Sequence, residues 1–441
     1  MKLARNSRRT LLCALALTLA GASGAQAATY TVNTRTDPKP NGCTADDCTL
    51  REAVIAANKH RGADTIVLPS RSAYKLGLKS TGEDKAANGD LDLTSGGLKI
   101  VHTGRGTATI DAKRTDRVFD VLGAKATFDK LTIRGGYSNK ADAGGDGGGI
   151  VVERGSLTVQ RSRVISNRAP WVGGNGGGID SDSSSLVKVV DSDVSNNDSG
   201  GSGGGIEGSP TGKLLIQRTR IAGNKAAQAG GVMVFGPPVR IVDSAVVTNN
   251  AAAGPEVEGD GGGIFVGNKG RLELVNSTVA GNGAFTSGGG IFSDAGSQAV
   301  ISFSTIARNR ADSDSKFGGT TGGIHLRTAG VQVAANARVS NSIVALNTET
   351  GGAAADCGGI GFLGSGVNLV TTTNQGKCSA INPIVAANPG LGPLGGNGGA
   401  TPTIALLAGS PAIGAATGKA PARDQRGVRR SDPDLGAYER R

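Results

Sequence analysis

Two carboxylates, Asp180 and Glu207, follow the same short motif, Gly-Gly-Ile, at successive occurrences along the chain. In a β-strand, the residue after an inward-pointing isoleucine points outward. If the two motifs lie on neighbouring parallel strands, their carboxyl groups are about 5 Å apart, close to the spacing found in retaining glycoside hydrolases. Repulsion between two such close carboxylates would keep a proton on one of them, as an acid catalyst requires. The pair is therefore a candidate for cleavage of a glycosidic bond.

Aromatic side chains take the same position further along the chain, at Phe265 and Phe292, followed by His325. Stacked on neighbouring strands, these rings would form a flat apolar platform of the kind that packs against sugars. Two less specific interpretations remain open, because exposed acids often only solubilise a protein and stacked phenylalanines often pack beneath a loop. The sequence has no nucleophile elbow, phosphate-binding loop or metal-ligand cluster, and its other histidines, His60 and His102, are too dispersed to complete a triad.

The motif that carries these residues is a repeat. Gly-Gly-(Ile/Val) returns at intervals of 26 to 33 residues, ending at Ile150, Ile179, Ile206, Val232, Ile264, Ile291 and Ile324. A second element, Val/Ile-x-x-Asn, recurs in step with it, and a short apolar segment rich in β-branched residues lies between the two. A fixed period without helical periodicity is typical of a solenoid. We therefore predict an all-β parallel β-helix in which each repeat forms roughly one coil.

The residue types that recur at two positions of this repeat have a structural reason. Glycines at a coil corner permit positive φ and close approach of neighbouring backbones. Asparagine tolerates left-handed geometry, and its amide can hydrogen-bond to the asparagine of the next coil. We predict a structural ladder of Asn167, Asn197, Asn224, Asn250, Asn282, Asn309 and Asn347. The segment Gly-Gly-Asp146-Gly-Gly-Gly also resembles a calcium-binding nonapeptide repeat, but tandem nine-residue copies are missing. We therefore predict no cofactor and keep calcium as the less favoured alternative.

The start of the repeat region has the pattern of a capping helix. Thr49 and Glu52 have capping-box spacing, and Leu50, Val54 and Ala57 share one helical face. This segment is expected to cover the first coil.

Four cysteines remain after the first 27 residues, in two pairs that are close in sequence. The pairs favour local disulfides, Cys43–Cys48 and Cys357–Cys378, although three connectivities are possible and a zinc site is the alternative.

The first 27 residues are typical of a signal peptide, with a basic start, an apolar core at 11–20 and the cleavage motif Ala25-Gln26-Ala27. Arg8 and Arg9 also resemble a twin-arginine signal, so the export route stays open between the two systems. The apolar core is too short to span a membrane. We predict an exported protein, either secreted or associated with the cell surface or periplasm, without a transmembrane segment.

The net charge and its distribution along the sequence indicate which classes of binding partner to expect. Removing the signal peptide takes away four cations and lowers the net charge from +11 to +7. The remaining cations are scattered in the sequence and form no Lys/Arg-rich run, which argues against nucleic-acid binding. Attraction to an acidic polysaccharide or an anionic cell surface is compatible with this charge.

The two ends of the chain carry the most specific resemblance. The segment Cys48-Thr-Leu-Arg-Glu-Ala-Val54 resembles the Cys-Ser-Leu-Arg-Glu-Ala-Ile motif that opens a family of exported bacterial β-helix proteins. The segments 395–403, 409–413, 424–427 and 434–439 are similar to the choice-of-anchor region that ends such proteins. The repeats themselves resemble the Gly-Gly-Ala-Ile and Phe-x-x-Asn repeats of chlamydial polymorphic outer-membrane proteins. This resemblance implies a right-handed parallel β-helix that is exported. Because no translocator barrel or anchor follows Glu439, it also implies a freely secreted or loosely associated protein.

These observations divide the chain into a signal peptide (1–27), an N-terminal cap (28–62), a parallel β-helix (63–347) and a segment with the last coils and an irregular cap (348–441). The favoured function is non-catalytic binding of a polysaccharide, a surface glycan or a surface protein by a monomer, as in adhesins. The alternatives are a lyase, epimerase or hydrolase acting on an acidic polysaccharide, or a structural matrix component.

Overall fold

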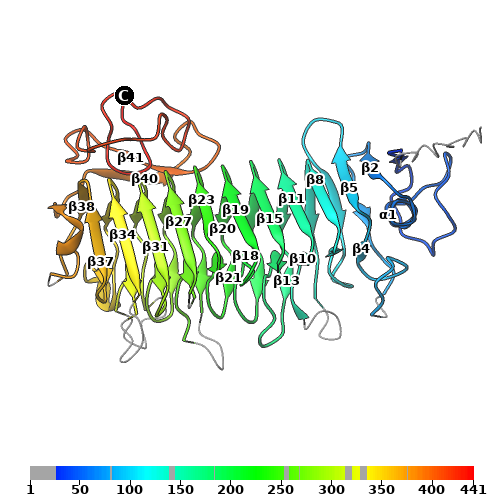
Figure 1. Ribbon diagram of the computed structural model, residues 1–441, viewed down its shortest axis with the longest axis horizontal. Helices are drawn as coiled ribbons and strands as arrows, with labels where there is room; N and C mark the ends of the chain where they lie inside the picture. The colour runs from blue at the N-terminus through cyan, green and yellow to red at the C-terminus, as the bar shows by residue number, and fades with distance from the viewer. Residues whose placement is uncertain are drawn as a thin grey trace, which may run out of the picture.

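The coils predicted from the repeat stack along one axis. The computed structural model describes residues 26–79, 82–138, 145–182, 184–252, 258–267, 269–312, 320–327, 335–374 and 376–441. The predicted signal peptide lies outside these residues as far as residue 25. Figure 1 shows an elongated stack of coils with a helix at its N-terminal end and the C-terminal segment on its flank near the other end.

Three long parallel sheets run the length of the stack, and a short fourth one lies at a corner. Sheet I contains, in spatial order, β1 Thr29–Thr31, β2 Ala63–Leu68, β5 Gly97–His102, β8 Lys125–Asp129, β11 Ser156–Gln160, β15 Leu186–Val190, β19 Lys213–Gln217, β23 Val239–Val242, β27 Arg271–Val275, β31 Gln298–Ser302, β34 Asn336–Ser340 and β37 Phe362–Ser365. Sheet II contains β3 Tyr74–Lys75, β6 Ala108–Asp111, β9 Leu131–Arg134, β12 Arg163–Ile165, β16 Asp193–Ser195, β20 Arg220–Ala222, β24 Ala245–Val247, β28 Thr278–Ala280, β32 Thr305–Ala307, β35 Ile343–Ala345, β38 Asn368–Val370 and β39 Pro383–Val385.

Sheet III contains β4 Leu91–Leu93, β7 Phe119–Leu122, β10 Ile150–Glu153, β14 Ile179–Ser181, β18 Ile206–Glu207, β22 Val232–Val234, β26 Ile264–Val266, β30 Ile291–Ser293, β33 Ile324–Leu326 and β36 Cys357–Gly358. Sheet IV contains β13 Arg168–Ala169, β17 Asp198–Ser199, β21 Lys225–Ala226, β25 Asn250–Ala251 and β29 Gly283–Ala284. The parallel stacking therefore begins at β1, inside the segment expected to be a cap, and continues to β39.

The core is a narrow column filled by the inward residue of each strand. In one coil these residues are Ile179, Val189 and Val194, and in the next they are Ile206, Ile216 and Ile221, all with no exposed surface. Neighbouring strands place identical repeat positions in register, so each apolar side chain packs against its counterparts above and below. Burial of each aliphatic side chain stabilises the folded state by about 1.5–3 kcal/mol, which makes this column the main source of stability.

The asparagine ladder is confirmed with one correction. It consists of Asn167, Asn197, Asn224, Asn249, Asn282, Asn309 and Asn347. Each side-chain amide and each backbone N–H donates to the carbonyl oxygen of the next asparagine at 2.9–3.1 Å. Asp356 accepts the last of these bonds from Asn347 at 2.9 Å.

The prediction of Asn250 as a ladder member is wrong. Val246 pairs with Ile221 and faces the core, so the residue three positions later, Asn249, enters the ladder. Asn250 instead begins β25 and is only partly buried. Both asparagines fit the local pattern, and the stacking register selects between them.

A second ladder was not predicted. It contains hydroxyl side chains at the corner between sheets I and II, namely Ser162, Ser192, Thr219, Ser244, Ser277, Ser304 and Ser342. Each backbone N–H donates to the hydroxyl oxygen of the next coil at 3.1–3.4 Å. These bonds provide acceptors for buried backbone N–H groups at the turn, where the sheet hydrogen bonding is interrupted.

The N-terminal cap is a helix, α1 Leu50–Lys59, as predicted. Thr49 and Glu52 form a complete capping box, and Leu50, Val54 and Ala57 are buried against the first coil. The predicted disulfide Cys43–Cys48 precedes the helix. Within the described part of the chain, no helix is both long enough and apolar enough to traverse a bilayer.

The C-terminal end differs from the prediction of an irregular cap over the last coil. The loop closed by the predicted disulfide Cys357–Cys378 covers the open end, where Cys378 and Ile381 join the main core. The segment that follows, from β40 Leu391–Gly395 through the antiparallel β41 Thr403–Leu406 to the C-terminus, turns back along the flank. Its apolar side chains pack on the outer face of sheet II, whose strands offer small residues there. We call residues 391–441 the flank segment.

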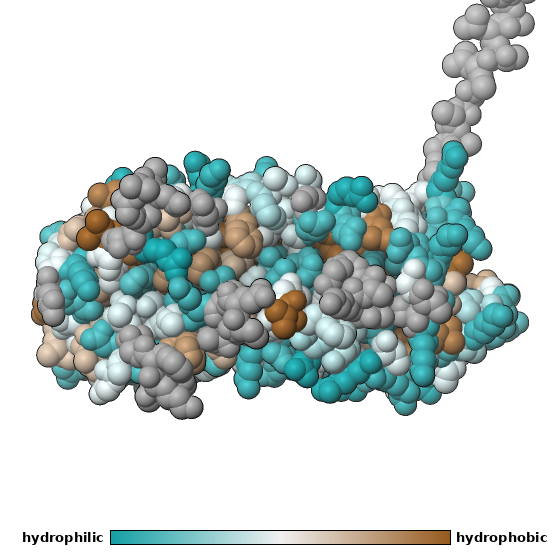
Figure 2. Space-filling model, turned by 90° about the horizontal axis from the view of Figure 1, so that it is seen from below, coloured by the Kyte–Doolittle hydropathy of each residue, from teal (hydrophilic) through white to brown (hydrophobic). Residues whose placement is uncertain are grey.

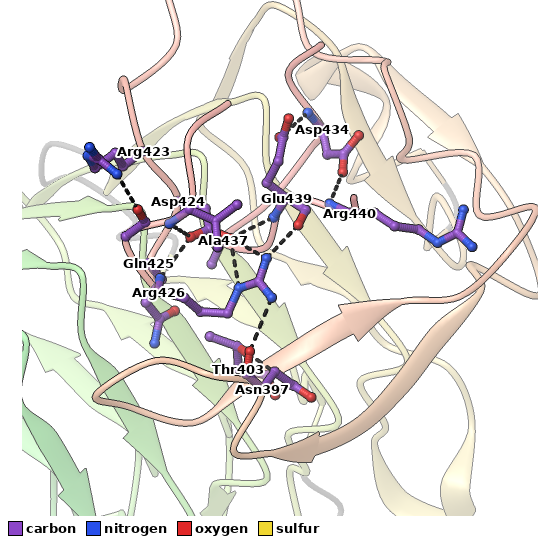
Figure 3. Close-up of polar contacts among 12 residues, drawn as sticks. Asn397, Thr403, Arg423, Asp424, Gln425, Arg426, Asp434, Ala437, Glu439 and Arg440 are labelled. Carbon is purple, nitrogen blue, oxygen red and sulfur yellow. Dashed lines mark hydrogen bonds and ion pairs between the residues drawn. The ribbon is translucent and has the colours of Figure 1, made fainter. Parts of the chain in front are cut away.

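A polar cluster folds the flank segment onto itself (Figure 3). The carboxylate of Asp424 accepts hydrogen bonds from the backbone N–H groups of Arg426, Val428 and Glu439 at 2.9 Å. It also pairs with the Arg426 guanidinium at 2.7 Å, which in turn lies 3.6 Å from the centre of the Tyr438 ring. Residues of the segments 424–427 and 434–439 therefore hold the flank segment together.

Candidate functional site

The outward positions that follow the Gly-Gly-(Ile/Val) motifs form one continuous row on sheet III, which two aspartates on the preceding strands extend. In order along the stack this row is Asp92, Asp120, Val151, Asp180, Glu207, Met233, Phe265, Phe292 and His325. Asp180 and Glu207 lie on adjacent strands, as the sequence predicts. We call this set the corner row, because a glycine corner lies over it.

Most of the corner row is buried, whereas Glu207 and His325 are partly exposed. Gly176 and Gly203 adopt positive φ of +59° and +64°, and a Cβ at either position would lie within 3.0 Å of Asp180 or Glu207, respectively. Each corner thus folds back over the side chain four residues later, and only 7% of Asp180 is exposed. This close approach explains why the repeat requires glycine there.

The aromatic residues of the corner row stack as predicted, but they are buried and do not form an exposed platform for a ligand. Phe265 and Phe292 do stack, with ring centres 4.9 Å apart, and His325 continues the stack at 5.2 Å. However, Phe265 is 4% exposed and Phe292 is 2% exposed, and both belong to a buried cluster with Met233. Because the rings lie beneath the corners, a sugar cannot reach their faces.

His325 is held neutral in this stack. Burial, followed by the charges of Arg327 and Lys377, lowers its pKa from 6.5 to about 4. Its Nδ1 lies 3.1 Å from the hydroxyl of Thr321. A neutral imidazole stacked on Phe292 completes an apolar column, so the histidine has a packing role here.

The carboxylate pair has an unusual electrostatic environment. Burial raises the pKa of Glu207 from 4.5 to about 7, and it raises the pKa of Asp180 well above 3.8, with Glu207 and Asp146 adding to the effect. Ser202 donates a hydrogen bond to Glu207 at 2.6 Å. Neither Asp180 nor Glu207 forms an ion pair with a cation in the described ranges. The pair therefore holds at least one proton near neutral pH, as a role in acid catalysis would require.

Replacing Glu207 with glutamine is expected to stabilise the protein at pH 8 by about 1–3 kcal/mol and to have little effect at pH 4. The folded state keeps the Glu207 proton up to about pH 7, whereas the unfolded chain releases it near pH 4.5. Wild-type stability therefore falls as the pH rises through this interval, and the neutral amide of the variant would not contribute to that loss. Denaturant titrations at both pH values test this expectation. An equal effect of the substitution at both would contradict it.

A second surface, on the outer face of sheet I, is open and basic. The strands of sheet I carry seven cations, which are Lys99, Lys125, Lys188, Lys213, Arg240, Arg271 and Arg338, all exposed. Their acidic residues are Asp64 and Asp129, both at most 3% exposed, and Glu273. Of these cations, only Lys99 and Arg240 form ion pairs within the described residues, with Asp129 and Glu273 respectively.

Four of these cations lie on consecutive strands. Lys188 on β15, Lys213 on β19, Arg240 on β23 and Arg271 on β27 place one cation per strand. Since parallel strands are about 4.8 Å apart, this set runs along the stack for about 14 Å. We call these four residues the basic stripe.

Two apolar side chains lie beside the basic stripe on the same face, Leu186 with 50% and Val300 with 45% exposure, and Leu363, with 47%, lies further along it on β37. At the N-terminal end of sheet I, Lys99 and Lys125 line a shallow depression whose floor includes glycines. By contrast, the view in Figure 2 shows hydrophobic areas that are small and separated by hydrophilic ones. The basic stripe was not predicted from the sequence, although its members stand at outward positions of the strand-like segments.

The comparisons with known proteins agree with the fold. The family model for the right-handed β-helix region matches residues 118–305 and 177–375, which together span more than half of the chain. The chain therefore belongs to the right-handed β-helix family, and the predicted fold class is confirmed. Among solved structures it is similar to the crystal structure of pectate lyase Pel9A, with a TM-score of 0.52 and 15% identity over 95% of this chain and 97% of that one. At this identity the similarity shows the fold alone. No curated protein matches the chain.

Proposed function

We propose that the protein binds an acidic polysaccharide along the outer face of sheet I and does so without cleaving it. The observation that carries this proposal is the basic stripe, which presents one exposed cation on each of four consecutive strands. Lys188 and Arg240 stand in one register column, and Lys213 and Arg271 stand two residues earlier on their strands. A negatively charged polymer lying along the stack would therefore meet cations alternately on two parallel lines.

Two further features support binding on this face. Lys188, Lys213 and Arg271 have no ion-pair partner in the described part of the chain, so a polyanion would pair with them without breaking existing pairs. Leu186 and Val300 are exposed beside them and would pack against the apolar faces of sugar rings. The buried Phe265 and Phe292 take no part in this proposal.

Matched ligands test the proposal. Polygalacturonate and alginate, each compared with its carboxyl-reduced form, differ mainly in charge. We expect the affinity of the purified protein, measured by calorimetry, to fall at least about tenfold on carboxyl reduction and to decrease with added salt. Equal binding of the charged and reduced polymers would contradict the proposal.

A second candidate function is cleavage of a polysaccharide by the carboxylate pair. The observation that favours it is the position of Asp180 and Glu207 on adjacent strands, with the pKa of Glu207 at about 7. Release of reducing ends or unsaturated sugars from the same polymers, lost in both Asp180→Asn and Glu207→Gln, would establish this function in place of simple binding. The 7% exposure of Asp180 is the observation against it, because a scissile bond must reach the carboxyl groups.

A further inference from the structure

Three carboxylates meet at the N-terminal end of the corner row. Asp92 on β4 and Asp120 on β7 are register partners, and Asp90 directly precedes β4. Each residue offers an oxygen atom, and these oxygens all lie within 4.8 Å of one another. The three side chains are 0–5% exposed. Figure 1 shows β4 beside α1 at this end of the stack.

One arginine contacts two of these carboxylates. Arg117 pairs with Asp120 at 2.6 Å and with Asp90 at 3.2 Å. Holding three carboxyl groups this close together in a buried site is costly without a compensating cation.

Asp92 supplies an independent observation. Its Oδ2 accepts a hydrogen bond from the backbone N–H of Ala86 at 2.6 Å. Its Oδ1 is buried and has no hydrogen-bond partner within the described ranges. An oxygen that is buried, has no hydrogen-bond partner and lies next to two other carboxylates has the environment of a metal-ligand atom.

We propose that Asp90, Asp92 and Asp120 bind one divalent cation of the calcium type. Carboxylate oxygens are the preferred ligands of this hard cation, and oxygens within 4.8 Å of one another are close enough to converge on a single ion after small side-chain adjustments. The positive charge of the ion would offset the repulsion among the three carboxylates. This site differs from the Gly-rich segment around Asp146, where the sequence suggested calcium as a rival interpretation.

The cation would connect the first coils to the segment that covers them. Residues 82–92 form a turn-rich segment whose carbonyl groups at Ala86, Gly89 and Asp90 accept hydrogen bonds from Arg51 of α1 at 2.7–3.1 Å. Asp92 holds the same segment through Ala86. Calcium at Asp92 therefore stabilises the junction of the cap helix with the solenoid, independently of polysaccharide binding.

Calorimetry and thermal unfolding of the purified protein test this proposal. After removal of divalent ions with a chelator, we expect calcium chloride to bind with one-to-one stoichiometry and to raise the Tm. In Asp92→Asn we expect calcium affinity to fall at least about tenfold and the Tm to lose its response to calcium. Because the substitution removes one of three crowded, buried carboxyl groups, this variant should melt at a higher temperature than the wild type when both are free of metal.

The matched control is Asp84→Asn, which makes the same change at an exposed carboxylate of the same segment. It should retain the wild-type response to calcium. Absence of both a calorimetric signal and a Tm shift in the wild type would overturn the proposal, and this result does not depend on the folding of any variant. Unchanged calcium binding by Asp92→Asn would also overturn it.

Discussion

Substitution of Asn249 by alanine is expected to lower the free energy of unfolding by about 3–5 kcal/mol. The side chain is 1% exposed and makes four hydrogen bonds at once. Its carbonyl accepts from the backbone N–H and the amide of Asn224 at 2.9–3.0 Å, and its amide donates to Ile221 and to Asn282 at 3.0–3.1 Å. Alanine would leave these buried polar groups unpaired, and each such group costs about 1–3 kcal/mol. Denaturant titration monitored by circular dichroism measures the loss.

Asn250→Ala is the matched control for this prediction. Asn250 is the adjacent residue in the chain and fits the same sequence pattern, but it lies in β25 outside the ladder and is only partly buried. Its substitution should change stability by no more than about 0.5 kcal/mol. Equal effects of the two substitutions would show that the ladder does not contain Asn249.

Substitution of Arg430 by alanine is expected to detach the flank segment, at a cost of about 3–5 kcal/mol. The guanidinium is buried and pairs with Glu439 at 3.2 Å. It also donates to the side chain of Asn276, in the adjoining coil, at 3.0 Å and to the carbonyl of Gly436 at 2.7 Å. Its centre lies 5.1 Å from that of the Phe303 ring. Without Arg430, the Glu439 carboxylate would be buried without its cation, and the link to the coils through Asn276 would be lost.

Limited proteolysis distinguishes detachment from general unfolding. In Arg430→Ala, cleavage should occur near residue 390 and leave the solenoid intact, because the three long sheets do not depend on the flank segment. Arg429→Ala is the control, since Arg429 is exposed and adjacent. A proteolytic pattern of Arg430→Ala identical to that of the wild type would contradict the proposed docking role.

The repeat is the part of the molecule that sequence predicts best. A motif that recurs once per coil determines the fold, the inward isoleucines and the neighbour relation of Asp180 and Glu207, because stacking places equal positions in register. The sequence does not distinguish Asn249 from Asn250 as the ladder residue. Val246 and Asn249 fit the Val-x-x-Asn pattern, and so do Val247 and Asn250. Only the pairing of Val246 with Ile221 resolves this ambiguity.

The functional surfaces are harder to predict for a geometric reason. Period-two alternation correctly orients Phe265 and Phe292 away from the core, but it does not reveal that the preceding glycine corner folds back over them. The members of the basic stripe look scattered in the sequence because they are separated by whole coils, for example Lys188 and Lys213. Coiling brings them onto adjacent strands. The flank segment has no repeat at all, so nothing in its sequence indicates which face it covers.

Binding of an acidic polysaccharide should depend on the basic stripe and not on the overall positive charge. Two triple variants with the same change in net charge separate these explanations. The first replaces Lys188, Lys213 and Arg271 with glutamate. The second makes the same replacement at Lys79, Lys225 and Lys419, which are exposed cations outside sheet I.

The deciding measurement is the affinity of both variants and the wild type for polygalacturonate at one fixed salt concentration. We expect the stripe variant to bind about 100-fold more weakly than the wild type, a difference of ~2.7 kcal/mol, and the control variant to change by less than about threefold. Equal losses in the two variants would mean that net charge alone attracts the polymer. Retention of full affinity by the stripe variant would place the binding site on another face of the solenoid.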